Sequence, residues 1–221
     1  MTPKIPGIDA LLFDLGNVVV RIEFSRIFGF WANRSGQTID TIRSRFSFDV
    51  FYERYERGEI CRSEYFDSLR RSLKIRLSDE ELAEGWASIF TGEILGMRSL
   101  LQRLASQVPL YVFTNTNECH EEVWRRIYAE TLGCFQKIFT SHAIGMREPE
   151  PAAFAKIAAA IGVRPNQVLF FDDLYENVEG ARAIGMEARL VRSIEDIEQA
   201  VVEWVPSDQR QRTPMPPRNR N

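Results

Sequence analysis

The chain has 221 residues, of which 44% are hydrophobic and 27% are charged, the ordinary composition of a globular protein large enough to bury a core. Its formal net charge of −3 gives no reason to expect a nucleic-acid partner. No run of about 18 apolar residues is present, which argues against a membrane span, and residues 1–7 lack the apolar stretch of a secretory signal.

The cysteines and histidines argue against several kinds of site. Cys61, Cys119 and Cys134 are odd in number, widely spaced and in no metal-ligand pattern, which is typical of reduced thiols. His120 and His142 are the only histidines, so the sequence does not favour a His-based zinc site or a catalytic triad. We therefore expect a cytoplasmic protein.

The first predicted element is a buried strand, Ala10–Phe13, which ends at Asp14. Helical patterning dominates the residues that follow, and no strand is expected there. Ser78 and Glu81 form a capping box before the last of these helices. Apolar residues recur at spacings of three and four in four segments: Phe24–Arg34, Thr41–Tyr55, Ser63–Leu73 and Asp79–Phe90. We interpret residues 20–92 as an inserted α-helical cap.

From residue 94 onward, predicted helices and strands alternate. The expected strands are Pro109–Phe113, Lys137–Thr140, Val168–Phe171 and Ala188–Val191. The expected helices are Ile94–Leu104, Glu118–Glu130, Pro151–Ile161, Asn177–Ala183 and Ile194–Trp204. This alternation predicts an α/β fold, a Rossmann-like doubly wound parallel sheet with right-handed crossovers. The core domain would comprise residues 1–19 and 93–205.

The last segment, residues 206–221, differs in composition from the rest. It holds four prolines and four arginines against one aspartate. Such a segment cannot bury enough apolar surface to order itself, so we expect a disordered basic tail.

Carboxylates stand at the ends of two predicted strands. Asp14 follows the first strand, and Asp172 and Asp173 follow the strand Val168–Phe171. In open α/β sheets, ligands bind in the crevice beyond the carboxyl ends of the strands, where the strand order reverses. If the loops that carry polar residues meet at one such crevice, Ala10–Phe13 is the central strand, with the strand that ends at Asp172 on one side and the strand that ends at Phe113 on the other. Oxygen ligands from two strand ends favour a site for a hard cation. The competing interpretation is that these aspartates only form turns or cap helices.

Four motifs now stand in order at strand ends: FDLGNV at 13–18, FTNT at 113–116, GMREPE at 145–150 and FDD at 171–173. Together they resemble the haloacid dehalogenase (HAD) superfamily, in the branch with a C1-type helical cap after the first motif. The pattern is most similar to bacterial sugar-phosphate phosphatases of the α-glucose-1-phosphatase type. The resemblance extends from residue 8 to about residue 192.

The resemblance implies a role for each matching residue. Asp14 would be the nucleophile and would form an aspartyl-phosphate. Mg²⁺ would be held by Asp14, the main-chain carbonyl of Gly16 and Asp173, with Asp172 in or next to its coordination shell. Thr114 and Asn115 would bind phosphoryl oxygens by hydroxyl and backbone N–H. An N-cap is the other interpretation of the Thr-Asn pair, although Asn117 can fill that role.

A second pair of residues would anchor the loop after the metal carboxylates. The resemblance gives this role to Asn177 and Gly180. Helix capping is an equally good interpretation of Asn177.

The sequence departs from the family pattern at two positions. Gly16 stands where most phosphatases of the superfamily carry an aspartate that protonates the leaving group; the α-glucose-1-phosphatase type carries the same glycine. A good leaving group, a water or a cap acid would have to replace it. The candidate acids are Glu23, Asp49, Glu53 and Glu56.

At the second position, Glu148 replaces the lysine that neutralises the nucleophile and the phosphoryl group. The change would cost about a hundredfold to a thousandfold in rate, because one well-placed electrostatic donor is worth roughly 3–4 kcal/mol. Arg147 is the nearest substitute, although neighbouring residues at a strand end point apart.

We therefore expect an Mg²⁺-dependent phosphatase that acts on a small phosphorylated metabolite, such as a sugar phosphate. One alternative is a catalytically weakened member that binds a phosphorylated ligand or a protein partner, which Gly16 and Glu148 favour. The other is a 2-haloacid dehalogenase, which uses the same nucleophile on carbon. The substrate and the oligomeric state stay open.

Overall fold

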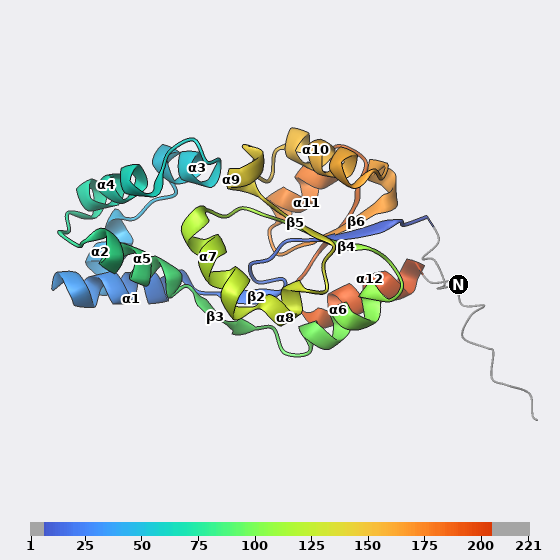
Figure 1. Ribbon diagram of the computed structural model, residues 1–221, viewed down its shortest axis with the longest axis horizontal. Helices are drawn as coiled ribbons and strands as arrows, with labels where there is room; N and C mark the ends of the chain where they lie inside the picture. Colours follow the sequence, from blue (N-terminus) through green and yellow to red (C-terminus); the bar gives the residue numbers. More distant parts are fainter. Residues whose placement is uncertain (1–6, 205–221) are drawn as a thin grey trace, which may run out of the picture.

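A five-stranded parallel sheet forms the centre of the computed structural model, which describes residues 7–204 (Figure 1). Its order is β5-β4-β1-β6-β7, as predicted for the central strand and its two neighbours. The strands are β1 (Ala10–Phe13), β4 (Leu110–Thr114), β5 (Lys137–Thr140), β6 (Val168–Asp172) and β7 (Glu187–Leu190). The predicted basic tail, residues 206–221, lies outside the described residues.

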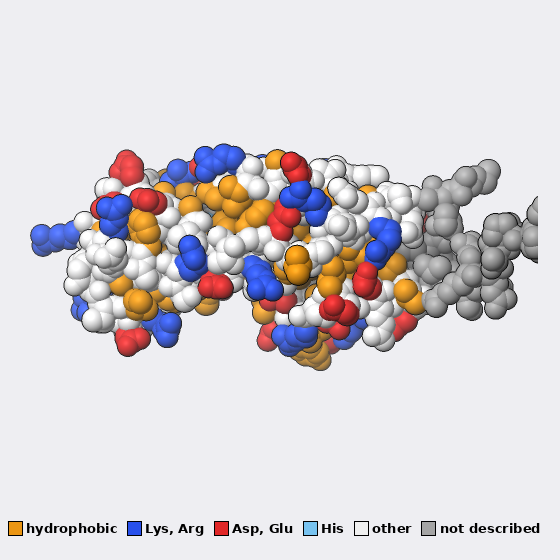
Figure 2. All heavy atoms as spheres, turned by 90° about the horizontal axis from the view of Figure 1, so that it is seen from below, with side chains coloured by type: hydrophobic (Ala, Val, Ile, Leu, Met, Phe, Trp, Pro, Cys, Tyr) orange, Lys and Arg blue, Asp and Glu red, His pale blue; other side chains and the backbone are white. Residues whose placement is uncertain are grey.

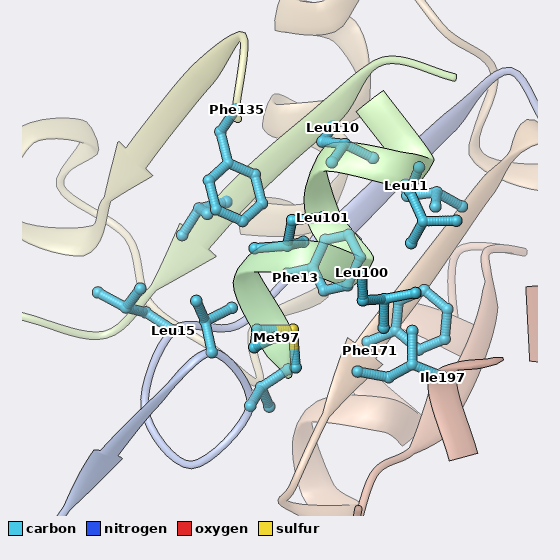
Figure 3. Packing of buried hydrophobic residues seen from close by; sticks show 14 of the residues in the cluster. Leu11, Phe13, Leu15, Met97, Leu100, Leu101, Leu110, Phe135, Phe171 and Ile197 are labelled. Carbon is cyan, nitrogen blue, oxygen red and sulfur yellow. The ribbon is translucent and has the colours of Figure 1, made fainter. Parts of the chain in front are cut away.

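Helices cover both faces of the sheet, so the inner strands β1 and β6 are buried on both sides, as parallel strands usually are, while the edge strands β5 and β7 are partly exposed. Alternate residues enter different cores: Leu11 and Phe13 pack on one face, and Leu12 packs on the other. On the first face, these strand residues meet Met97, Leu100 and Leu101 of α6 and Ile197 of α12 (Figure 3). That face is covered by α6 (Met97–Ala105), α7 (Glu118–Ile127), α8 (Ala129–Leu132) and α12 (Ile194–Trp204).

The other face is covered by α10 (Pro151–Ile161) and α11 (Tyr175–Arg182), and α9 (Ser141–Ile144) follows β5. The sequence predicted α10 with the same first and last residues. Proline at the first turn fits a helix start, and Gly162, with φ 72°, provides the left-handed residue that ends it. The helix predicted over Glu118–Glu130 is instead divided, because Tyr128 leaves the helical conformation before α8 begins.

Five helices form the cap, at the left of Figure 1, around an aromatic core of their own. Trp31 and Trp86 stack there with centroids 5.5 Å apart, and Trp86 stacks on His120 of α7 at 4.8 Å. The cap core is therefore continuous with a helix of the sheet domain. The helices are α1 (Phe24–Ser35), α2 (Ile39–Arg45), α3 (Val50–Glu56), α4 (Arg62–Leu73) and α5 (Asp79–Ala87).

Two predictions for the cap were wrong. The single helix expected over Thr41–Tyr55 is two helices, because Phe46 is extended and Asp49 caps α3 by accepting hydrogen bonds from two backbone N–H groups. The expected absence of strands was also wrong, since β2 (Val20–Ile22) and β3 (Phe90–Glu93) form an antiparallel pair. Such short strands carry no detectable periodicity. Because this pair spans the predicted boundaries near residues 20 and 92, the division into core and cap stays a prediction.

The surface shows charges of both signs. On the face in Figure 2, acidic and basic side chains are interspersed, and the outline is indented between cap and core. Cys61 is exposed, Cys119 is buried and Cys134 is half-buried, and all three are free thiols, as expected. Among residues 7–204, the helices are too short or too polar to cross a membrane.

Candidate active site

Asp14 lies at the end of the central strand, where register places it beside Asp172. Phe13 is paired with Phe171, and the Asp14 N–H donates to the Phe171 carbonyl at 2.9 Å. The Asp14 carboxylate is 9% exposed and accepts hydrogen bonds from the Leu15 N–H and the Thr114 hydroxyl. Burial, and then the charges of Asp172 and Asp173, raise the pKa of Asp14 well above its usual range.

The pair after β6 is held by two asparagines from different parts of the chain. Asp172 is fully buried and accepts hydrogen bonds from the Leu174 N–H at 2.7 Å and from Asn177 Nδ2 at 2.9 Å. Asp173 accepts one from Asn17 Nδ2 at 3.3 Å. Asn177 therefore anchors the acidic loop, and its alternative role as a helix cap was wrong, because α11 begins after Leu174.

In the loop after Asp14, a side chain at position 16 would displace the end of the Ile22 side chain. A Cβ on Gly16 would lie 2.9 Å from the Ile22 side chain and 3.8 Å from Asp14 Oδ2. Asn17 next to it adopts φ 55°, a left-handed conformation that asparagine tolerates. Its Oδ1 accepts a hydrogen bond from the Ile22 N–H, while its amide reaches Asp173. Asn17 thus connects the nucleophile loop to the acidic loop, a role that the motif alone did not reveal.

Thr114 and Asn115 end β4 next to Asp14, and their side chains have different tasks. The Thr114 hydroxyl faces the Asp14 carboxylate. The Asn115 side chain binds the backbone of Glu148 twice: its Nδ2 donates to the Glu148 carbonyl at 3.0 Å, and its Oδ1 accepts from the Glu148 N–H at 2.8 Å. Only the Asn115 backbone is then left for a phosphoryl group. Asn117 caps α7, so neither Thr114 nor Asn115 is the N-cap of that helix.

Glu148 points into the acidic cluster. It is 1% exposed, and one ligand oxygen each from Asp14, Glu148 and Asp172 lie within 4.8 Å of one another. Among the described residues, neither Glu148 carboxylate oxygen has a hydrogen-bond partner. Burial, and then the charges of Asp172 and Asp14, raise its pKa well above the usual range. Glu148 therefore lies where the sequence predicted, facing the carboxylate of Asp14, and the repulsion between these like charges is unfavourable.

Arg147 does not replace the missing lysine, because its guanidinium is directed at the cap. Its nitrogens lie 2.9 Å from Glu56 Oε2 and 3.5 Å from Glu53 Oε1, both on α3. A second ion pair, between Arg57 and Glu150, also joins cap and core. These pairs hold the cap against the segment that carries Glu148.

A cavity of about 70 Å³ lies between cap and core, next to the nucleophile loop. Glu56 is the one cap acid of the four candidates that lines it. Asp49 is used to cap α3, the Glu53 side chain is 46% exposed, and Glu23 lines a separate cleft. The cavity lining includes Leu15, Gly16, Ile22, Phe24, Tyr52, Glu56, Phe90, Thr114, Asn115, Thr116, His120 and Trp124.

The carboxylate cluster predicts how stability depends on pH without metal. Burial raises the pKa of Asp172 to about 7, and the pKa values of Asp14 and Glu148 are also raised. The folded chain therefore keeps protons that the unfolded chain has lost, so stability falls as pH rises. His120, whose burial lowers its pKa to about 3, acts in the opposite direction, but only below its ordinary pKa of 6.5.

Between pH 6.5 and 8.5, we therefore expect the unfolding free energy to fall by about 1.4 kcal/mol per pH unit for each retained proton. Urea denaturation in EDTA at the two pH values measures this change. Glu148→Gln should weaken the pH dependence. A wild-type unfolding free energy that stays constant or rises over this range would contradict the prediction.

Comparison with known proteins adds evidence that is independent of this geometry. The family model of haloacid dehalogenase-like hydrolases matches residues 8–185. Phosphatase MT3486 of Mycobacterium tuberculosis is 30% identical over 171 residues, which cover 76% of this chain and 72% of the relative. D-ribitol-5-phosphate phosphatase of Bacteroides thetaiotaomicron is 23% identical and is matched over 88% of its length by 80% of this chain.

Among solved structures, a HAD family enzyme from Bacteroides thetaiotaomicron, in complex with magnesium and inorganic phosphate, has the same fold. The TM-score is 0.77 at 24% identity, and the match covers 88% of this chain and 99% of that enzyme. A predicted HAD-like family hydrolase from Porphyromonas gingivalis gives a TM-score of 0.76 at 19% identity, over 89% of this chain and 97% of that protein.

Proposed function

Because this chain belongs to the haloacid dehalogenase-like hydrolases, we propose that it is an Mg²⁺-dependent phosphatase of a small phosphorylated metabolite. The observation that carries the proposal is the position of Asp14, buried at the central strand end beside Thr114 and within 4.8 Å of two further carboxylates. Named relatives that are phosphatases support the reaction, and the similar structure with magnesium and inorganic phosphate supports the cofactor.

The residues present fit a hard cation. Asp14 and Asp172 are buried carboxylates that form no ion pair with a lysine or arginine within residues 7–204. Such a group is stable only when a cation or a proton offsets its charge. In the proposed site, the Asp14 carboxylate, the Gly16 carbonyl and Asp173 hold Mg²⁺, and Asp172 lies in or next to its shell. When bound, Mg²⁺ would offset negative charge on the phosphoryl oxygens.

In the proposed reaction, Asp14 attacks the phosphorus atom while the bond to the leaving oxygen breaks, which gives an aspartyl-phosphate and an alcohol. The Thr114 hydroxyl and the Asn115 backbone N–H bind the phosphoryl oxygens. Water then attacks the phosphorus while the bond to the Asp14 oxygen breaks, and its proton goes to the group that protonated the leaving oxygen; inorganic phosphate is released and Asp14 is restored. Closure of the cap over the site keeps bulk water away from the first step.

Glu56 is our candidate for the proton donor that Gly16 cannot provide. It lines the same cavity as Gly16 and Thr114, and burial raises its pKa, which keeps a proton available nearer neutral pH. We expect Glu56→Gln to lower kcat for an alkyl phosphate about a hundredfold or more and to affect p-nitrophenyl phosphate much less, because nitrophenolate leaves without a proton. Equal losses on both substrates, measured by steady-state kinetics, would exclude this role.

The test of the proposed function is hydrolysis of p-nitrophenyl phosphate and a sugar-phosphate panel by the purified chain, with EDTA and with millimolar Mg²⁺. Phosphate release only with Mg²⁺ is the expected result. Parallel thermal melts should show stabilisation by Mg²⁺, since the ion binds the native state. Asp173→Asn should remove most of both effects. No hydrolysis together with no thermal shift would contradict the proposal.

A second function is favoured by one observation. The uncompensated Glu148 beside Asp14 suits a chain that has lost turnover and binds a phosphorylated ligand or a protein partner instead. The same assay separates the two functions, since a binding protein would be stabilised by phosphorylated ligands without releasing phosphate.

A further inference from the structure

Glu148 is held in a fixed position within the acidic cluster. Its backbone N–H and carbonyl are both fixed by the Asn115 side chain. The next residue, Pro149, packs against α11 so closely that a Cβ on Gly180 would lie 2.2 Å from the Pro149 carbonyl oxygen. Gly180 therefore supports this segment rather than the loop after Asp173. Two independent contacts thus hold Glu148 in place, and its buried carboxylate is directed at Asp14 and Asp172.

Within the described structure, no lysine or arginine forms an ion pair with Glu148, although the nearby charge of Arg147 partly opposes the rise in its pKa. Arg147, its neighbour, is committed to Glu56 and Glu53 of the cap. Both Glu148 oxygens lack a hydrogen-bond donor among residues 7–204, although the side chain is 1% exposed. A buried, unpaired carboxylate costs several kcal/mol, so a fixed one takes up a proton, as expected for the metal-free protein, or binds a cation.

We propose that Glu148, Asp14 and Asp172 bind a second divalent cation, adjacent to the Mg²⁺ assigned to Asp14, Gly16 and Asp173. This inference rests on the proposed function. One ligand oxygen from each of the three carboxylates lies within 4.8 Å of the others. That spacing spans a Ca²⁺-sized ion, whose ligands lie about 2.3–2.6 Å from the metal, and contracts slightly for Mg²⁺, at about 2.1 Å.

The second cation explains how the chain works without the lysine of related phosphatases. A divalent ion beside Asp14 supplies positive charge on the side of the nucleophile where Glu148 stands. Glu148 is then a metal ligand, and the positive charge beside Asp14 comes from the bound cation and not from a lysine side chain.

The test is the number of cations bound by the full chain. The protein is stripped with EDTA and titrated calorimetrically with Mg²⁺ and, separately, with Ca²⁺. We expect two equivalents for the wild type and one for Glu148→Gln, which keeps the shape of the side chain. Asp173→Asn should retain the Glu148-dependent equivalent. Glu150→Gln is the matched control: it removes the same charge two residues away, from a side chain that is 35% exposed and paired with Arg57, and should leave two equivalents.

A second measurement needs no variant. Two Mn²⁺ ions that share the Asp14 carboxylate should give an exchange-coupled electron paramagnetic resonance spectrum, whereas a single ion gives six lines. One equivalent in the wild type, two equivalents in folded Glu148→Gln, or an uncoupled Mn²⁺ spectrum at saturation would each overturn the proposal.

These results are distinguishable from those of the activity assay. Hydrolysis of phosphomonoesters with only one bound cation would support the proposed function and contradict the second cation site. Binding of two cations without phosphate release would support the second cation site and contradict the proposed function.

Discussion

Replacing Asp14 with asparagine is expected to abolish hydrolysis, lowering kcat by at least about a thousandfold, because the attacking carboxylate oxygen is lost. Asparagine has nearly the same shape, so the fold should persist. The substitution also removes one negative charge from a cluster in which burial and two neighbouring aspartates raise the pKa of Asp14. We therefore expect the metal-free variant to unfold at a higher temperature than the wild type at pH 8.

Phosphate release and thermal melts in EDTA measure the two effects. Asp40→Asn, the same chemical change at an exposed position of α2, is the control and should alter neither. An Asp14→Asn protein that retains more than about a tenth of the wild-type rate would exclude covalent catalysis by this residue. A lower melting temperature would show that its charge is already offset in the metal-free protein.

The second large effect is expected for Glu148→Lys. The new ammonium group would lie among carboxylates and would offset the charge of Asp14 and of the phosphoryl oxygens. At limiting Mg²⁺, we expect kcat to rise about a hundredfold, since one well-placed electrostatic donor is worth roughly 3–4 kcal/mol. At saturating Mg²⁺ the gain should be smaller, because the second cation already supplies this charge in the wild type. Burial at 1% exposure leaves little room, so an overpacking cost of about 1–3 kcal/mol in stability is also expected.

Steady-state kinetics over a range of Mg²⁺ concentrations test this prediction. A gain that appears in kcat reports an interaction that strengthens in the transition state, and a gain in KM reports uniform binding. Asp14→Asn in the Glu148→Lys background must remove the gain. A folded Glu148→Lys protein that is no faster than the wild type at any Mg²⁺ concentration would contradict the charge deficit assigned to Glu148.

Local patterns were sufficient to predict most of the sheet domain. A four-residue apolar run predicted β1, and helix α10 was predicted to the residue because Pro151 and Gly162 mark its ends in the sequence itself. The strand order followed from one requirement, that loops carrying polar residues meet at one edge of a parallel sheet. Asp14 and Asp172 were therefore expected to be neighbours, and in the structure they lie together.

Elements without a local signal could not be predicted. The β2–β3 pair joins residues about seventy positions apart, and its strands are too short for an alternating pattern to appear. The break between α2 and α3 depends on Asp49, whose side chain competes with the helix for backbone N–H groups, and an acidic residue within a helical pattern does not reveal that choice.

By itself, the sequence determined which chemical groups are available: an aspartate at the end of the first strand, two further aspartates at another strand end, and a glutamate where a lysine was expected. Only the tertiary structure decided how they are used. It directed Arg147 to the cap, turned the Asn115 side chain to the Glu148 backbone, and placed Glu56, but not the other three candidate acids, in the lining of the cavity. These orientations depend on contacts between residues far apart in the sequence, such as the hydrogen bond from Asn17 to Asp173, 156 positions away. Such contacts form only when the whole chain packs, so the spacing of neighbouring residues does not predict them.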